Sequence, residues 1–398
     1  MNLLGKNILK IDDILFSKAI KMENPVIEHD LGALLYFCTK YKYSKEILYK
    51  EKTIELFTKL LDVFSEFDFQ TGLLEGFDGI GWVLNYLKKC EIINTDEQLK
   101  DMDDVLIQSI RLNINTNNFD LLYGSIGKIQ YLIDSGRYNE KQIKDLIDGI
   151  INKLYETRIE KNKRIYWFEL DTDKINLGLS HGLASIFVFL IKLQDLNFKN
   201  KNLNKMISGI IKSYSYFENK IPGASSFGAS FPYTKNNTSH SRLAWCYGDL
   251  GIAYSFIYAG NVLKKQSIKT KYNEMLSLIL QRELPDSGLV HYYNYSFFDT
   301  GFCHGLSGIY YILFKMNEME PNSILKNKIK YWEDELLKNL SIQLSIEGDV
   351  IFPETKQGTD EIYKIDKETM LNGLCGVGLV LLTMKYKKAD WSDFFLLY

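Results

Sequence analysis

A Gly-x-x-Gly-apolar pattern recurs along most of the 398-residue chain and constrains its fold more than any other feature. Successive first glycines lie 48, 58, 66, 57 and 68 residues apart, a spacing typical of helical repeats. The six clear copies begin at Gly76, Gly124, Gly182, Gly248, Gly305 and Gly373. Ser185 replaces the second glycine of the copy at Gly182. A degenerate copy at His29 to Ala33 brings the expected number of repeats to seven.

Each copy is followed by a run that is apolar on nearly all sides, such as 252–257 or 309–314, which is typical of a buried helix. Amphipathic stretches between the copies, such as 142–160 and 323–340, predict helices with one solvated face. Seven helix pairs predict an all-α protein, with a single catalytic domain over residues 1–398. We expect the pairs to close into a ring, because an open array would need polar capping repeats.

Four segments do not fit the helical pattern and predict irregular or strand-like additions to it. They lie near 157–177, 219–244, 285–300 and 341–355. The most strand-like runs within them are 164–170, 288–297 and 349–352, while 222–241 is rich in Gly, Ser, Asn and Pro and predicts a loop. These additions either form a small β-rich extension that handles a substrate or are plain connections.

Charge and cysteine usage narrow the class of protein. A formal net charge of −2 gives no general basic field for nucleic acid. The start of the chain lacks the apolar run of a secretory signal, and no apolar stretch is long enough to span a bilayer. Five cysteines without an export signal indicate free thiols or metal ligands in a reducing compartment. We therefore expect a cytoplasmic protein, associated with a membrane only through partner proteins.

The candidate catalytic and metal-binding residues lie just before the first glycines of the copies, which we call the signature glycines. Cys246 precedes Gly248 by two positions, and Cys303 and His304 come directly before Gly305. In the preceding repeats, His181 comes directly before Gly182 and Asp120 lies four positions before Gly124. Since equivalent positions of neighbouring repeats meet at one mouth of a helical ring, we expect all five side chains along one arc.

Two thiolates and an imidazole from Cys246, Cys303 and His304 form a zinc-type ligand set. Soft sulfur with one nitrogen favours zinc over copper or iron. Three protein ligands leave a fourth position open, as in catalytic zinc sites. Such an ion is suited to ionising and holding an incoming thiol. The alternative is that both cysteines are buried apolar thiols and the histidine makes an ordinary hydrogen bond.

His181 and Asp120 are the candidate proton-transfer pair. Addition of a thiol to an electrophilic alkene leaves an enolate, and an imidazole suits its protonation near neutral pH. Asp120 either fixes the tautomer of His181, contacts the substrate, or serves only as a helix N-cap. His181 itself has the alternative of a structural histidine at a helix start.

The motifs Ser241-Arg-Leu-Ala-Trp-Cys-Tyr-Gly248, Cys303-His-Gly305 and Ser180-His-Gly182 resemble those of the lanthionine synthetase C family, the lanthipeptide cyclases. The resemblance implies a seven-fold α/α toroid with zinc at its mouth. It also implies an enzyme that adds cysteines of a dehydrated precursor peptide to dehydroalanine or dehydrobutyrine. The products are the lanthionine or methyllanthionine rings of lantibiotics, and a dehydratase and an ABC exporter are the implied protein partners.

The resemblance also implies a site. The family's zinc ligands fall on Cys246, Cys303 and His304, and its acid/base histidine on His181. Its functional Asp, Arg and Tyr fall on Asp120, Arg242 and Tyr247. Arg242 either binds the substrate carbonyl and stabilises the enolate or forms a structural salt bridge. Tyr247 either forms a hydrogen bond at the site or packs against a helix.

Two other functions compete with cyclisation. One is an intermolecular transferase that adds glutathione or another thiol to a reactive alkene. The other is a non-catalytic peptide-binding scaffold with a structural zinc, which the open ligand position and His181 argue against. The remaining candidate residues are weaker. We expect Cys38, Cys90 and Cys375 in the core, His240 and His291 exposed, and His29 as a marker of the first repeat.

Overall fold

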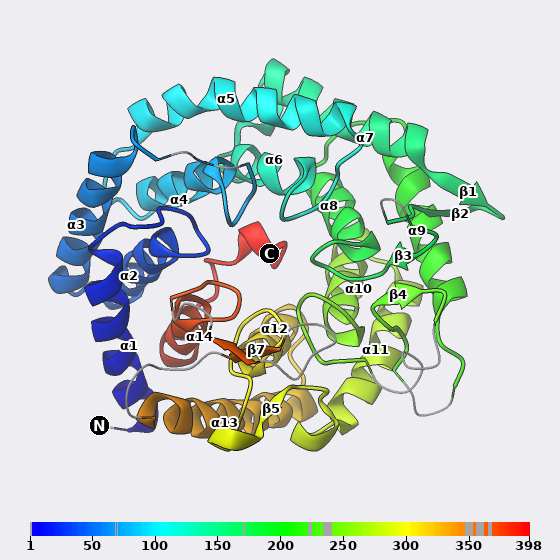
Figure 1. Cartoon of the computed structure of the whole chain (residues 1–398). Helices are drawn as coiled ribbons and strands as arrows, with labels where there is room; N and C mark the ends of the chain where they lie inside the picture. The colour runs from blue at the N-terminus through cyan, green and yellow to red at the C-terminus, as the bar shows by residue number, and fades with distance from the viewer. Residues whose placement is uncertain are drawn as a thin grey trace. The chain divides into compact units, whose positions relative to one another are not determined.

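The computed structural model describes residues 2–67, 69, 71–169, 172–221, 225–233, 241–346, 353–355, 362–364 and 368–398. Over these residues it contains fourteen α-helices and eight short strands, many of them labelled in Figure 1. Two kinds of helix alternate along the chain. We call them signature helices, which begin at the Gly-x-x-Gly copies, and intervening helices, which lie between the copies in sequence.

Each of the seven copies begins a helix at its second residue. These signature helices are α2 (Asp30–Ser44), α4 (Phe77–Lys89), α6 (Ser125–Asp134), α8 (Leu183–Asp195), α10 (Asp249–Leu263), α12 (Leu306–Met319) and α14 (Leu374–Tyr386). Because α2 begins directly after His29, the degenerate first copy starts a helix as the clear copies do. The expected position of every signature helix is confirmed.

Close backbone packing explains the second glycine in copies such as those that begin at Gly248 and Gly305. A Cβ atom on Gly308 would lie 2.0 Å from the carbonyl oxygen of Phe302, and one on Gly251 would lie 2.5 Å from that of Trp245. A side chain does not fit in this gap, so glycine lets the preceding loop fold back onto the first helical turn. The first glycine of one copy, Gly248, has a φ of +86°, a left-handed conformation that favours glycine.

The signature helices are buried on all sides, as their composition predicts. In α10, the twelve residues from Asp249 to Gly260 are all buried, and in α14 the eleven residues from Leu374 to Met384 are buried. A helix that is apolar all round needs neighbours on every face. None of the helices in the described part of the chain combines the length and the hydropathy needed to cross a bilayer.

The intervening helices bury one face only. They are α1 (Leu3–Ala19), α3 (Ile47–Val63), α5 (Asp96–Asn115), α7 (Lys141–Thr157), α9 (Leu203–Phe217), α11 (Gln266–Gln281) and α13 (Ser323–Ser345). In α7 the buried residues recur every three or four positions, at Ile143, Leu146, Ile147, Ile150, Ile151 and Leu154. This period places one apolar stripe against the protein and leaves the charged residues in solvent.

Short antiparallel strand pairs lie in the segments between helices. They are β1–β2 (Ile159–Lys161 with Arg164–Tyr166), β3–β4 (Ile175–Asn176 with Ser230–Phe231), β5–β6 (His291–Tyr292 with Phe297–Phe298) and β7–β8 (Pro353–Thr355 with Ile362–Lys364). They form four separate two-stranded sheets among the described residues. The small β-rich addition to an all-α fold is therefore present.

Some expected boundaries were wrong. The helix predicted over 142–160 ends at Thr157, because Asn162 and Lys163 both have positive φ and close the tight turn of the β1–β2 hairpin. The strand predicted over 288–297 is interrupted by a 3₁₀ turn at 293–295. The strand-like run at 349–352 lies outside the described residues, as do 222–224 and 234–240 of the predicted loop.

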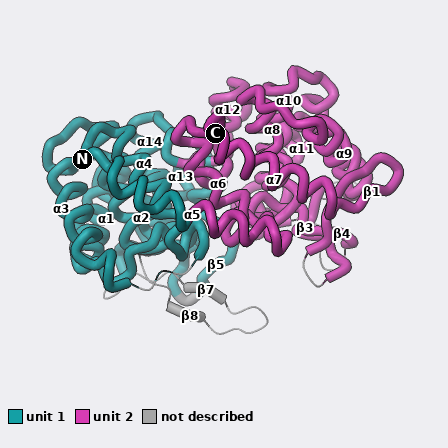
Figure 2. Tube along the Cα trace, turned by 90° about the horizontal axis from the view of Figure 1, so that it is seen from above, with its two compact units in different colours: residues 1–105, 289–311, 329–391 teal, residues 106–288, 312–328, 392–398 magenta. Residues whose placement is uncertain are grey.

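The chain divides into two compact units, coloured in Figure 2. Unit 1 comprises Met1–Val105, Leu289–Tyr311 and Ile329–Trp391, and unit 2 comprises Leu106–Gly288, Ile312–Lys328 and Ser392–Tyr398. In unit 1, α14 packs against α1 and α2, so the last signature helix contacts the first. In unit 2, α10 packs against α8 and α11. The expected single catalytic domain over 1–398 stays a prediction.

The end of the chain is buried in the core of unit 2. The side chains of Phe394 to Leu397 are fully buried. The indole nitrogen of Trp245 donates to the carbonyl of Phe395 at 3.2 Å, and the two rings lie 4.9 Å apart. The hydroxyl of Tyr398 donates to Oε1 of Gln130 at 2.6 Å. The C-terminal segment therefore supports the loop that carries Cys246.

Candidate metal centre

The loop before α10 holds Cys246 in a fixed position. Its carbonyl accepts hydrogen bonds from the backbone N–H of Leu179 at 2.9 Å and of Ser180 at 3.4 Å. Gly178 allows this approach, because a Cβ atom there would lie 2.2 Å from the oxygen of Cys246 and 2.7 Å from Cδ1 of Tyr247. Cys246 is only 6% exposed. The loop of one repeat is thus fastened to the loop of the repeat before it.

The loop before α12 is fastened in the same way. The backbone N–H groups of Phe302 and Cys303 both donate to the carbonyl of Leu371 at 2.8 Å. Leu371 stands two positions before Gly373, as Cys246 stands two positions before Gly248. In both pairs of repeats, one carbonyl at this position accepts two consecutive amides from the preceding repeat. Repeating backbone geometry therefore places both cysteines at equivalent points.

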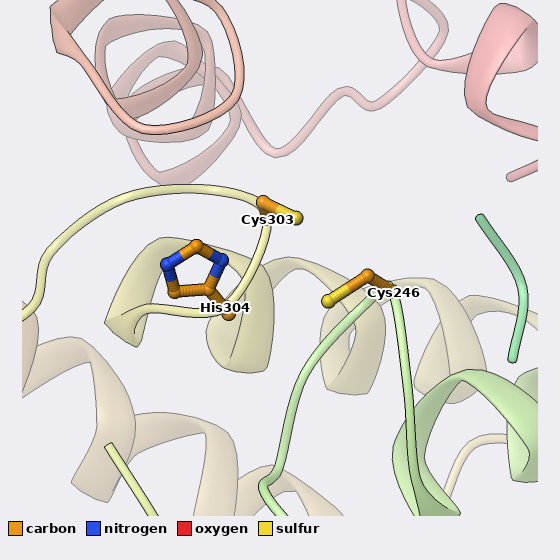
Figure 3. A group of neighbouring side chains, drawn as sticks. All are labelled: Cys246, Cys303 and His304. Atoms are coloured by element: carbon orange, nitrogen blue, oxygen red, sulfur yellow. The ribbon is translucent and has the colours of Figure 1, made fainter. Parts of the chain in front are cut away.

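Cys246, Cys303 and His304 lie together, as Figure 3 shows. Their candidate ligand atoms are all within 4.8 Å of one another. A tetrahedral zinc with Zn–S bonds near 2.3 Å holds its two sulfurs about 3.8 Å apart, so small side-chain rotations bring the set to bonding distance. The donor set of two soft sulfurs and one imidazole nitrogen also fits zinc chemically.

His181 and Asp120 form a close pair. Nδ1 of His181 lies 2.7 Å from Oδ2 of Asp120, and the two side chains are 30% and 19% exposed. The other carboxylate oxygen of Asp120 accepts the backbone N–H groups of Leu122 at 2.7 Å and Tyr123 at 2.9 Å. Asp120 therefore caps the turn that leads into α6 and contacts His181 at the same time.

The surroundings of His181 favour its protonated form. Burial alone would lower the pKa of His181. The hydrogen bond and the negative charge of Asp120, with smaller contributions from Cys246 and Glu169, outweigh burial and raise this pKa above its ordinary value. A charged imidazolium beside a carboxylate at 2.7 Å is the expected result of such a pair.

Two tyrosines flank the imidazole of His181. The ring of Tyr123 is stacked beside it at 6.2 Å with an interplanar angle of 7°, and the ring of Tyr247 lies at 6.4 Å. Tyr123 is 46% exposed and was not among the residues singled out from the sequence. A tyrosine directly before a signature glycine is the signal that could have identified it.

Arg242 lies on the same loop as Cys246. Its Nε donates to the carbonyl of Gly288 at 3.1 Å, and the side chain is partly exposed. Within the described ranges Arg242 forms no ion pair, so the structural salt bridge considered above is not found there. The roles suggested for Arg242 and Tyr247 stay predictions.

The other cysteines and histidines that the structure describes are not part of the candidate metal centre. Cys38, Cys90 and Cys375 are buried, as expected for core thiols, and burial raises the pKa of Cys38 and Cys375. The expectation that His291 is exposed was wrong. It is half-buried, with its ring 4.3 Å from that of Tyr293 and 4.4 Å from that of Phe298. His240 lies outside the described residues, and His29 precedes α2.

Comparison with known proteins places the chain in a family. A solved structure, nisin cyclase, matches 99% of this chain and 97% of its own with a TM-score of 0.75 and 20% identity, which confirms the fold class, an all-α toroid. Nisin biosynthesis protein NisC of Lactococcus lactis subsp. lactis is 26% identical over 312 residues, covering 70% of each chain. The family model described as lanthionine synthetase C-like protein matches residues 29–397. The chain therefore belongs to the lanthionine synthetase C-like proteins.

Proposed function

We propose that this protein is a zinc-dependent lanthipeptide cyclase. It would add cysteine thiols of a precursor peptide to dehydroalanine or dehydrobutyrine residues of the same peptide, forming lanthionine or methyllanthionine rings in lantibiotic biosynthesis. The observation that carries the proposal is the convergence of Cys246, Cys303 and His304 within 4.8 Å. Membership of the lanthionine synthetase C-like family and the likeness to NisC, a nisin biosynthesis protein, support it.

Cys246, Cys303 and His304 would hold the ion and leave one tetrahedral position for the substrate. Bound zinc would lower the pKa of the peptide thiol, so that its proton passes to water near neutral pH and the sulfur stays nucleophilic. The two cysteine ligands would already balance the charge of the ion, which favours holding a thiolate over generating hydroxide. The sulfur would then attack the β-carbon of the dehydroamino acid.

His181 would complete the reaction. Attack at the β-carbon moves the alkene electrons to the α-carbon as an enolate, which must gain a proton. With Nδ1 paired to Asp120, His181 would present Nε2 to the substrate and deliver that proton. The hydrogen bond and the negative charge of Asp120 outweigh burial and raise the pKa of His181, which increases the protonated fraction at a given pH. Arg242 would bind the carbonyl oxygen on which negative charge develops, and Tyr247 would border the same space.

The partners follow from this chemistry. The substrate must be a peptide already dehydrated at serine or threonine, so a dehydratase acts before this enzyme. An ABC exporter would carry the cyclised product. We propose that the enzyme works in the cytoplasm and meets a membrane only through such partners.

The test is incubation of the protein with a dehydrated peptide that contains cysteine. Because the addition leaves the peptide mass unchanged, free thiols are counted by labelling with N-ethylmaleimide before and after the reaction. We expect the thiol count to fall to zero with zinc-loaded protein and to stay unchanged after chelation. A peptide whose thiols remain free with zinc-loaded protein would count against the proposal.

The same assay separates the two rival functions. Addition of glutathione to the dehydrated peptide, with the peptide's own thiols left free, would indicate an intermolecular transferase. Binding of the peptide without any thioether would indicate a scaffold. A variant with His181→Asn distinguishes a catalytic effect from binding alone, since it should bind peptide and zinc but form rings slowly.

A further inference from the structure

We infer that Asp299 is a positioning residue that orients His304 and fixes its tautomer for metal binding. This inference rests on the proposed zinc site. Oδ2 of Asp299 lies 3.4 Å from Nε2 of His304, and Asp299 is only 6% exposed. A carboxylate that accepts the second N–H of a metal-binding imidazole is a recurrent feature of zinc sites.

Asp299 is held rigidly by its own loop. Its Oδ1 accepts the backbone N–H of Gly301 at 2.8 Å, and its backbone N–H donates to the carbonyl of Val290 at 2.9 Å. Its carbonyl accepts the N–H of Leu306 at 2.9 Å. Gly305 leaves room for this carboxylate, because a Cβ atom there would lie 2.6 Å from Oδ1. Oδ2 is therefore kept on the side of His304.

The equivalent residues of other repeats show that this turn does not need a carboxylate. Asn118 and Asn176 also lie six positions before a signature glycine. Their Oδ1 atoms accept the N–H two residues ahead, at 3.2 Å and 3.0 Å, as Oδ1 of Asp299 does. An asparagine oxygen thus satisfies the turn in two repeats. Asp299 differs from these asparagines in having a second carboxylate oxygen, Oδ2, and this oxygen faces His304.

The two histidines of the site pair with carboxylates through opposite nitrogens. His181 uses Nδ1 toward Asp120, whereas His304 uses Nε2 toward Asp299. In a neutral imidazole one nitrogen carries the proton and the other offers a lone pair. Asp299 therefore leaves Nδ1 of His304 as the ligand atom. Figure 3 shows one ring nitrogen of His304 toward the two sulfurs and the other turned away from them.

The variant that tests this is Asp299→Asn, which preserves the turn acceptor used in the other repeats. Its amide NH₂ would face Nε2 of His304 and favour the tautomer with the proton on Nδ1, the wrong one for the metal. We expect zinc affinity, measured by competition with a chromophoric chelator, to fall about 10- to 100-fold. The variant should keep the far-UV spectrum and melting temperature of the parent protein to within a few degrees.

Asn118→Ala is the matched control, since it removes the same turn acceptor in a repeat that lacks the candidate ligands. Its zinc affinity should equal that of the parent. The inference is overturned if Asp299→Asn binds zinc as tightly as the parent protein, or if Asn118→Ala weakens zinc binding equally.

A measurement on the unmutated, zinc-free protein tests the tautomer directly. With ¹⁵N-labelled histidine, two-bond ¹H–¹⁵N correlation spectra resolve the tautomers of the five histidines. We expect His304, assigned by its disappearance in His304→Ala, to be protonated at Nε2 only. Protonation at Nδ1 would overturn the inference. Failure of the parent protein to bind zinc would instead reject the proposed function, because the tautomer measurement does not require metal.

Discussion

His181 and Asp120 are joined through Nδ1 and Oδ2 at 2.7 Å, in a site where the carboxylate also caps a turn. This arrangement leaves Nε2 of His181 as the nitrogen available for proton transfer. It also makes the pKa of His181 depend on Asp120, because burial alone would lower that pKa and the carboxylate raises it. The reaction should therefore respond to pH through this pair.

Asp120→Asn should move the alkaline limb of the pH–rate profile to lower pH. The substitution removes the negative charge that raises the pKa of His181 while burial still lowers it. The protonated imidazole would then be lost at a lower pH, and with it the proton for the α-carbon. The measurement is the cyclisation rate between pH 5 and pH 9, pH values chosen to bracket the ordinary histidine pKa of about 6.5. An unshifted alkaline limb would show that Asp120 does not control His181.

The same pair should affect stability in a defined pH range. Because the folded-state pKa of His181 is raised, its stabilising contribution is fully present below the unfolded pKa and is lost as pH rises through the folded pKa. In Asp120→Asn this pH-dependent loss should be smaller. Urea unfolding at a series of pH values gives the comparison. Equal slopes of unfolding free energy against pH in both proteins would contradict it.

Cys303→Ala and His181→Asn should separate metal binding from proton transfer. Cys303→Ala removes one of three candidate ligands, so zinc content and cyclisation should be lost together. His181→Asn should retain zinc and slow cyclisation by about 10²- to 10⁴-fold. Zinc content is measured by elemental analysis of the purified variants. Full zinc in the first variant, or full turnover in the second, would contradict these assignments.

Gly178→Ala should destabilise the protein and weaken zinc binding. The added Cβ would meet the oxygen of Cys246 at 2.2 Å, so the loop that carries this ligand must move. We expect a loss of about 1–3 kcal/mol in the free energy of unfolding. Gly149→Ala is the control, since a Cβ there meets only Ile114 at 3.4 Å and lies within α7. The free energy of unfolding of Gly149→Ala should rise by about 0.5–1 kcal/mol.

Trp245→Phe tests whether the buried C-terminal segment supports the Cys246 loop. The change removes the donor to the carbonyl of Phe395 and leaves that buried oxygen without it. We expect the free energy of unfolding to fall by about 1–3 kcal/mol and zinc binding to weaken. Trp167→Phe removes a comparable bond, to the carbonyl of Leu154 at 3.2 Å, at a partly exposed position. Trp167→Phe should lower the free energy of unfolding by less and leave zinc affinity unchanged. Equal effects of the two variants on zinc affinity would show that the C-terminal segment does not support the Cys246 loop.

Much of the fold could be predicted because the repeat is local. Each Gly-x-x-Gly copy marks a helix start, and the reason is physical: a backbone carbonyl packs where a side chain would stand, as at Gly308. The proximity of Cys246, Cys303 and His304 followed from the same logic, since the two cysteines occupy equivalent positions of successive repeats and His304 is adjacent to one of them.

The features that were missed depend on backbone conformations and side-chain contacts that composition and spacing do not specify. The strand-like addition expected near 157–177 is present as the hairpin at 159–166, but the helix predicted over 142–160 ends earlier, at Thr157, because composition does not reveal the two positive-φ residues of the hairpin turn. His291 packs between rings brought together by the β5–β6 pairing. The burial of Phe395 beside Trp245 joins positions 150 residues apart. Asp299 was overlooked because the spacing argument considered only residues within four positions before a signature glycine, and Asp299 lies six positions before Gly305.

X-ray absorption at the zinc edge tests the central claim most directly. The purified protein should contain one zinc with two sulfur neighbours near 2.3 Å and nitrogen or oxygen neighbours near 2.0–2.1 Å. Addition of a cysteine-containing dehydrated peptide should raise the sulfur count from two to three, because the substrate thiolate takes the remaining position. A zinc without sulfur neighbours, or a sulfur count that stays at two when the peptide is bound, would contradict the account.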